Sequence, residues 1–221
     1  WKLKDFPTQS TNITLDFSSM QQLYNALKLG DIETTQSILD ANLQTIRNTG
    51  YVDEVIIKQI YYNFRNILLR IKLENYEDMT SIEIPVFEPS AHVRKLFENL
   101  SRCCEEICDH NRKQRESSKA RFNESVCTFI LENFSDKDLY AKMVANHFGI
   151  SETTLQKIVQ STIGKTFFEY VEELRLDKAY NMLKSTSNTV QHIASECGFS
   201  SQNSFYKAFK RRFNQSPGAL R

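Results

Sequence analysis

The sequence predicts an all-α protein with an N-terminal helical domain, residues 1–118, followed by residues 119–221, in which two helix-turn-helix motifs are joined by a central helix. Three observations predict this fold class. Apolar residues recur with the period of an amphipathic helix along most of the chain. A helix–glycine–helix pattern occurs twice in the second half. A polar, charged stretch, residues 109–121, separates the two halves.

Four amphipathic helices account for the N-terminal domain. The first ends at Gly30, Asp31 can cap the second, the third runs from about residue 52 to residue 75, and Ser90 opens the fourth. Between the third and fourth, residues 76–89 hold two prolines around an Ile-Glu-Ile alternation, which predicts a loop or a short strand. Residues 109–121 have no apolar side, so we expect an exposed helical connector there, the alternative being a flexible linker.

Cysteine usage and hydropathy limit the class of protein. Five cysteines cannot form a complete disulfide framework, which favours a reduced, cytosolic setting. The chain has no run of 18 apolar residues and no signal peptide. Cys103, Cys104 and Cys108, with His110 nearby, allow a metal site as one interpretation, but buried small apolar side chains are the better account. No metal or other cofactor is predicted.

The second helix-turn-helix motif occupies residues 189–213. Thr189 is a suitable N-cap, Gly198 supplies the positive φ of a sharp turn, and either Ser200 or Ser201 can cap the following helix. That helix repeats an inward aromatic side chain every four residues: Phe205, Phe209 and Phe213. Its other face is polar and cationic. A single match of this kind would also fit an ordinary helical hairpin with a solvated charged face.

The same pattern occurs earlier in the chain. Val144-Ala145-x-x-x-Gly149 aligns with Ile193-Ala194-x-x-x-Gly198, and the two glycines lie 49 positions apart. In each copy a small alanine precedes the glycine where two helices must cross closely. The repetition favours a pair of helix-turn-helix motifs over chance. Between them, Gly164 can end the first recognition helix and Thr166 with Glu169 forms a capping box for a helix whose apolar residues spread beyond one stripe. We expect that helix to be buried against both motifs and to determine their separation.

The outward side chains of both recognition helices suit double-stranded DNA. Lysine can donate to guanine or phosphate, glutamine and asparagine can pair with adenine, and threonine can contact a thymine methyl group. The candidate DNA-binding residues are Thr153, Thr154, Gln156, Lys157, Gln202, Asn203, Tyr206, Lys207, Lys210 and Arg211. Any one of these alone could be a solvated surface residue. The net charge is +1, with 14 basic and 10 acidic side chains in residues 119–221, so charge permits DNA binding but does not prove it.

From about Phe122 to Arg221 the chain resembles the AraC/XylS family of transcription regulators. The resemblance rests on Gly164-Lys165-x-Phe167, Arg175-Leu176-x-x-Ala179, Ile193-Ala194-x-x-x-Gly198-Phe199, Phe209-Lys210 and Ser216-Pro217. It departs from the family at Lys157-Ile158-Val159, at Asn214, where glycine is common, and at Ala219. The resemblance implies a sequence-specific regulator that contacts two adjacent major-groove segments and has RNA polymerase as a partner.

A looser resemblance covers the N-terminal half. Leu27-x-x-Gly30-Asp31, followed by long helices and a charged connector, is similar to the segment that precedes the DNA-binding half of YesN-type regulators. This implies a signal-relaying domain that forms a homodimer, although the helices could also form one monomeric bundle. Because the chain begins at Trp1, we expect an upstream receiver domain or membrane-anchored sensor outside it. The expected location is the cytoplasm. If the upstream part is a membrane-anchored sensor, this chain is the cytosolic end of that regulator.

Two other classes of function stay open. One is a non-DNA-binding helical interaction or dimerisation module. The other is an enzyme, because DNA-repair methyltransferases can carry this kind of DNA-binding fold together with reactive cysteines. Cys127 and Cys197 lie at core-like positions without a neighbouring base, and only six glycines are present, with no phosphate-binding loop. The sequence therefore predicts no enzyme and no catalytic residue.

Overall fold

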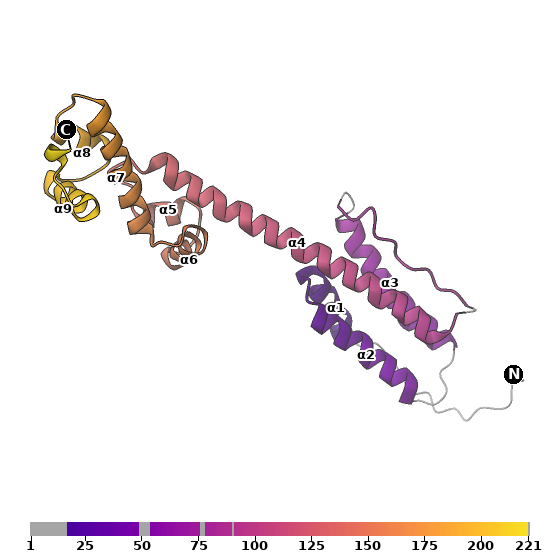
Figure 1. Ribbon diagram of the computed structural model, residues 1–221. Helices are drawn as coiled ribbons and strands as arrows, with labels where there is room; N and C mark the ends of the chain where they lie inside the picture. Colours follow the sequence, from indigo (N-terminus) through magenta and orange to yellow (C-terminus); the bar gives the residue numbers. More distant parts are fainter. Residues whose placement is uncertain (1–16, 49–53, 76–77, 90, 221) are drawn as a thin grey trace, which may run out of the picture. The chain divides into compact units, whose positions relative to one another are not determined.

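The computed structural model describes residues 17–48, 54–75, 78–89 and 91–220. Within those ranges it contains helices and no strand (Figure 1). The all-α prediction is confirmed. The helices are α1 (Phe17–Leu29), α2 (Ile32–Asn48), α3 (Glu54–Glu74), α4 (Val93–Asn133), α5 (Ala141–His147), α6 (Glu152–Ile163), α7 (Phe167–Ser185), α8 (Val190–Glu196) and α9 (Gln202–Phe213), followed by a short 3₁₀ helix, η1 (Pro217–Ala219).

The Cα positions divide the chain into two compact units, Trp1–Ser117 and Ser118–Arg221. The first unit has one apolar core, to which α1, α2, α3, the start of α4 and the segment between α3 and α4 all contribute. Tyr61, Phe64 and Phe97 are its largest fully buried side chains. The helical period of the sequence predicts this core because each helix carries one apolar stripe.

Polar contacts hold the corner between α1 and α2. The Asp31 carboxylate accepts a hydrogen bond from the Thr34 amide at 3.1 Å, as its predicted role as an N-cap requires. Asn111 and Arg115 of α4 donate to the carbonyls of Leu27 and Leu29, which lie at the end of α1. These donors satisfy carbonyl groups that have no partner within their own helix.

A second polar cluster joins α1 to the end of α3. The Glu74 carboxylate accepts hydrogen bonds from the Tyr24 hydroxyl and forms ion pairs with Lys28 and Arg70. Lys28, and after it Tyr24, lower the pKa of Glu74 to about 2. The contacts lie at the surface, so they orient α1 on α3 more than they stabilise the unit.

Of the two alternatives open from the sequence, a loop or a short strand, residues 82–88 form a loop, and it contacts α3. Side chains of α3 satisfy its backbone: Arg65 donates to the Pro85 carbonyl at 3.2 Å and Lys72 donates to the Ile82 carbonyl. The Phe87 ring packs on Tyr61, with ring centroids 5.3 Å apart. Pro85 has no N–H, and a prolyl residue in mid-segment suits an extended chain that pairs with no strand.

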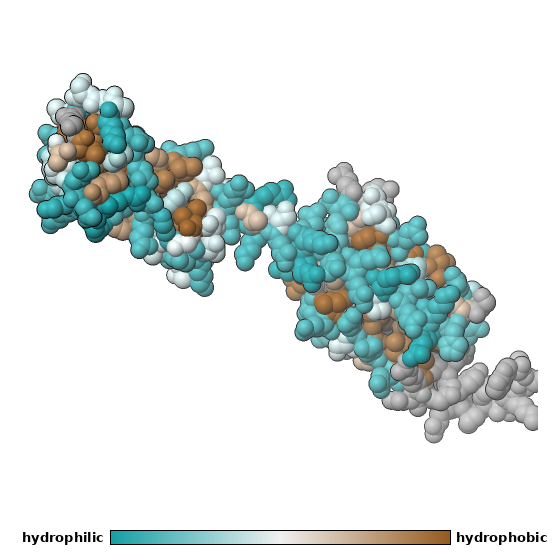
Figure 2. All heavy atoms as spheres, in the orientation of Figure 1, coloured by the Kyte–Doolittle hydropathy of each residue, from teal (hydrophilic) through white to brown (hydrophobic). Residues whose placement is uncertain are grey.

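Helix α4 is continuous through residues 109–121, so this stretch is helical, as favoured over a flexible linker. Nearly all of its side chains from Arg112 to Arg121 are exposed, and it is predominantly hydrophilic in Figure 2. A helix that is polar on all sides has no face to bury. Within the described residues, no helix combines the length and apolar character that a membrane crossing demands.

The second unit has two apolar cores that share α7. The first core joins the end of α4, α5 and α6 to Phe167 and Val171. The second joins α8 and α9 to Leu176, Ala179 and Leu183. The prediction that the central helix is buried against both motifs is confirmed. Because α7 contributes side chains to both cores, it sets the position of each motif relative to the other.

Candidate nucleic-acid interface

Each motif consists of a short helix, a glycine turn and a recognition helix. In the first, α5 leads through Gly149 to α6; in the second, α8 leads through Gly198 to α9. Both glycines have positive φ, +64° and +84°, as the sequence predicts. Thr189 caps α8 by accepting a hydrogen bond from the His192 amide at 3.2 Å. These turns and this cap can therefore be predicted from the local sequence alone.

The two recognition helices begin with equivalent serine caps. Ser151 accepts from the Thr154 amide and Ser201 accepts from the Ser204 amide, each at 3.1 Å. Ser201 rather than Ser200 is thus the cap of α9. The glycines lie 49 positions apart but the caps lie 50 apart, so the second turn contains one extra residue.

The equivalence established by the caps extends beyond the recognition helices. Both helices have 12 residues, and both end in a left-handed residue, Gly164 with φ 80° and Asn214 with φ 55°. Asparagine tolerates this conformation better than other non-glycine residues, which explains the departure from glycine at position 214. The next helical starts are also equivalent, with Thr166 capping α7 and Ser216 capping η1.

The recognition helices bury one face and expose the other. In α6 the buried side chains are Leu155, Ile158 and Val159, and in α9 they are Phe205, Ala208 and Phe209. Phe213 is partly buried against the same core as Phe209. Of the predicted DNA-binding residues, nine are exposed and Gln156 is half-buried. The packing therefore leaves a polar stripe on each recognition helix.

Seven of the ten predicted residues have side chains that make no hydrogen bond or ion pair to the rest of the described chain. They are Thr153, Lys157, Gln202, Asn203, Tyr206, Lys207 and Lys210. Tyr206 packs edge-on against the Phe205 ring, with centroids 6.1 Å apart. Seven polar side chains, three of them cationic, can thus meet a ligand without breaking an internal polar contact.

The other three predicted residues have internal partners. Thr154 is 2.9 Å from the Ser151 hydroxyl and belongs to the cap of α6. The Gln156 side-chain oxygen accepts a hydrogen bond from the Phe167 amide at 3.3 Å. Arg211 forms an ion pair with Glu172 of α7, although 67% of its side chain stays exposed. These contacts direct all three side chains partly toward the protein.

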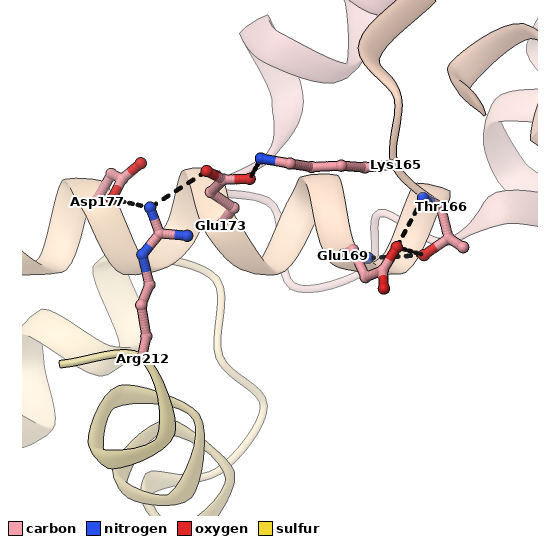
Figure 3. Close-up of polar contacts among 6 residues, drawn as sticks. All are labelled: Lys165, Thr166, Glu169, Glu173, Asp177 and Arg212. Carbon is pink, nitrogen blue, oxygen red and sulfur yellow. Dashed lines mark hydrogen bonds and ion pairs between the residues drawn. The ribbon is translucent and has the colours of Figure 1, made fainter. Parts of the chain in front are cut away.

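Carboxylates on α7 neutralise the basic end of α9 (Figure 3). Arg212 bridges Glu173, at 3.2 Å, and Asp177, at 2.8 Å, and Lys165 also pairs with Glu173. Lys165, and after it Arg212, lower the pKa of the Glu173 carboxyl. Thr166 and Glu169 form the predicted capping box beside this network. Of the cations on α9, Lys207 and Lys210 are therefore the two without a carboxylate partner in the described residues.

Arg175 and Lys178 of α7 bond to the segment that follows α4, and Lys178 also bonds to the end of α8. The Arg175 guanidinium donates to the carbonyls of Phe134 and Asp136, both at 2.7 Å. Lys178 donates to the Ser135 hydroxyl at 2.8 Å and to the Glu196 carbonyl at 3.0 Å. Burial lowers the pKa of Arg175. Cations at a helix C-terminus are favourable, because the helix dipole places partial negative charge there.

The sequence interpretation missed this connection and the acidic stripe on α7. Glu172, Glu173 and Asp177 recur at helical spacing on α7 and pair with arginines of α9, which is a detectable signal. Gln160, which the helical period also predicts to face outward, is not among the predicted DNA-binding residues, although it is exposed and its position in α6 is equivalent to that of Lys210 in α9. The Arg175 contacts have no local signal, because their acceptors are backbone carbonyls about forty residues away.

The cysteines lie in the cores. All five are free and buried, and burial raises the pKa of Cys103 to about 12 and that of Cys197 to about 11. Such thiols stay protonated at neutral pH and are poor nucleophiles and poor metal ligands. Within the described residues, no group of three or more histidine, cysteine, aspartate or glutamate side chains is placed to hold a metal ion.

Comparison with known proteins gives matches in the C-terminal region. Residues 144–221 match the family described as "Helix-turn-helix domain". The "HTH-type transcriptional activator RhaS" of Escherichia fergusonii is 33% identical over 106 residues, and that of Escherichia coli K12 is 35% identical over 106 residues. Each alignment covers 48% of this chain and 37% of the relative, so the chain matches little more than a third of these proteins.

Among solved structures, the C-terminal domain of AraT, a response regulator from Geobacillus stearothermophilus, is 28% identical, with a TM-score of 0.44. The similarity covers 45% of this chain and 83% of that domain. The residues that match the helix-turn-helix family include both capped recognition helices and the central helix that they share. The C-terminal region of this chain thus contains a helix-turn-helix domain, and its motifs resemble those of the AraC/XylS family.

Proposed function

We propose that this chain is a sequence-specific, double-stranded DNA-binding transcription regulator, with no enzymatic activity of its own. One observation carries the proposal: two recognition helices expose seven polar side chains that have no internal polar partner, and one shared helix holds both motifs. The likeness of residues in this region to transcriptional activators supports it. The buried, protonated thiols give no support to the methyltransferase alternative.

The proposed mechanism is geometric. Each recognition helix enters the major groove, and two such segments on one face of a duplex lie about 10 base pairs apart. Thr153 and Lys157 contact one element, and Asn203, Tyr206 and Lys207 contact the other. Because the two helices differ in sequence, the two elements differ as well, and one chain protects a non-palindromic site.

The first expected result concerns salt. Lys157, Lys207 and Lys210 are exposed and have no carboxylate partner within the described residues, so phosphate contacts by these lysines should release counterions. The affinity for a random-sequence duplex should fall steeply with salt concentration, and each lysine-to-alanine change should reduce the slope of log K against log salt by about 1. Fluorescence anisotropy titrations measure this. A flat slope, or no binding at low salt, would instead favour the non-DNA-binding interaction module.

The second expected result separates the two motifs. Lys157→Ala should relax base preference in one element and Lys207→Ala in the other, each by about 1–3 kcal/mol where the lysine contacts a base. The two positions are equivalent in α6 and α9, so each variant is the matched control for the other. A base-by-base scan of a selected duplex measures the effect. Equal losses at every position with both variants would mean that these lysines touch only phosphates.

For the N-terminal unit we propose homodimerisation and relay of a signal from an upstream receiver or sensor domain, in the cytoplasm. Exposed apolar side chains on α3 and the segment that follows support self-association: Leu73 is 70% and Val86 is 66% exposed. Sedimentation of the full chain at micromolar concentration should show a dimer, and Leu73→Glu should shift it toward the monomer of 25.8 kDa. A monomer at all concentrations would contradict this. RNA polymerase is the proposed partner once DNA is bound.

A further inference from the structure

Gln156 is the one predicted base-contacting side chain that is half-buried. Its side-chain oxygen accepts a hydrogen bond from the Phe167 amide at 3.3 Å. Phe167 is the first residue of α7, and the amides of the first helical turn have no partner within their helix. The Gln156 oxygen therefore satisfies an amide that the fold itself leaves unpaired, and it links α6 directly to the shared helix.

The second motif has no such need. The equivalent positions, 50 residues further on, are Tyr206 for Gln156 and Pro217 for Phe167. Proline has no N–H, so the second motif lacks the donor that Gln156 satisfies in the first. Tyr206 accordingly has only a ring contact with Phe205 and stays exposed. The glutamine acceptor and the donor amide are thus both present in the first motif and both absent from the second.

We infer that Gln156 is a positioning residue, which holds the first recognition helix against α7, and that it does not select adenine. The inference rests on the proposed function. Selection of adenine by glutamine needs the side-chain oxygen and nitrogen to face one base together, and here the oxygen is turned toward the Phe167 amide of α7. Only the nitrogen remains, and it can donate to a phosphate oxygen, to guanine or to thymine alike. The first motif therefore recognises bases through Thr153 and Lys157 alone. In the second motif Tyr206, the equivalent of Gln156, contacts bases together with Asn203 and Lys207.

The first arm of the test is hydrogen exchange at the Phe167 amide in the full chain. Gln156→Met keeps the length of the side chain but removes the acceptor, so exchange at Phe167 should accelerate about fivefold, the factor for one hydrogen bond of about 1 kcal/mol. Gln156→Glu keeps an acceptor and should restore the protection of the wild type. Exchange at Tyr170, whose amide bonds to the Thr166 carbonyl within the helix, serves as the internal reference.

The second arm measures base preference. The probes are duplexes of about 20 base pairs, two turns of DNA, selected by the full chain from a randomised library, and their single-base variants. Gln156→Met and Gln156→Glu should leave the base preferences unchanged at every position, with a uniform loss of affinity for the glutamate variant because it adds a negative charge. Tyr206→Leu should leave exchange at Phe167 unchanged and relax preference within one element.

Either of two results would overturn the inference. One is unchanged exchange at Phe167 in Gln156→Met. The other is a selective loss of adenine preference at one position, about 5- to 150-fold, which a base-contacting glutamine would produce. If the wild-type chain selects no duplex at all, the proposed function fails, while the exchange arm still tests whether the Gln156 oxygen holds the two helices together.

Discussion

Replacing Gly198 with alanine should destabilise the C-terminal unit by about 2–5 kcal/mol, whereas Gly149→Ala should cost only about 1–2 kcal/mol. Both glycines have positive φ, so both substitutions carry the penalty of a left-handed backbone. Only at Gly198 would the added Cβ collide, lying 2.8 Å from the Ser135 carbonyl oxygen and 3.0 Å from Nε of Arg175. At Gly149 nothing lies within 4 Å.

Urea unfolding of the full chain, followed through NMR signals of residues in α7 and α9, measures this difference. The two glycines occupy equivalent turns, so each variant controls for the backbone contribution of the other. Equal destabilisation by the two substitutions would show that the φ angle alone matters and that the Gly198 turn is not crowded. A greater loss for Gly149→Ala would contradict the placement of the second motif against the end of α4.

Replacing Arg175 with methionine should destabilise the same unit by about 3 kcal/mol. The change removes two charge-assisted hydrogen bonds, each worth about 1.5–3 kcal/mol, and leaves the carbonyls of Phe134 and Asp136 without these donors. Methionine keeps much of the apolar stem, so lost packing contributes little. Arg175→Lys should recover only part of the loss, because an ammonium group cannot reproduce the fork of two parallel donors.

Arg211→Met is the matched control for this prediction. Arg211 also contacts α7, but its ion pair with Glu172 is largely exposed, and such pairs contribute about 0–1 kcal/mol. Unfolding in urea compares the two variants directly. Since Gly198 and Arg175 are neighbours, the effects of Gly198→Ala and Arg175→Met should not add in the double variant. Similar small losses for both arginine variants would mean that Arg175 does not hold α7 against the segment that follows α4.

Local patterns in the sequence determined the elements of the C-terminal unit. Thr166 and Thr189 are caps, Gly149 and Gly198 have positive φ, and the apolar period of α9 places Phe205 and Phe209 in a core, all as predicted. Each of these properties depends on a residue and its neighbours within one or two helical turns. The repeated pattern could therefore be recognised without knowledge of contacts between distant residues.

Other predictions from the sequence lacked a deciding signal. Ser200 and Ser201 were equal candidates for the cap of α9, since both can accept the hydrogen bond, and the extra residue in the second turn selects Ser201. Residues 109–121 allowed a helix or a flexible linker, and they continue α4. The position of the turn decided the first case, and in the second the adjacent helical turns support the helix that was favoured over the linker.

The sequence by itself determined which residues form the two motifs and which faces of the recognition helices stay polar. Only the tertiary structure decided which polar side chains remain unpaired. Gln156 bonds to the start of α7, Arg211 pairs with Glu172, and Lys207 keeps no internal polar partner among the described residues. All three are among the side chains that the sequence predicts to face outward. They differ because α7 supplies an amide and a carboxylate at positions 11 and 39 residues away, and such distances leave no trace in a helical period.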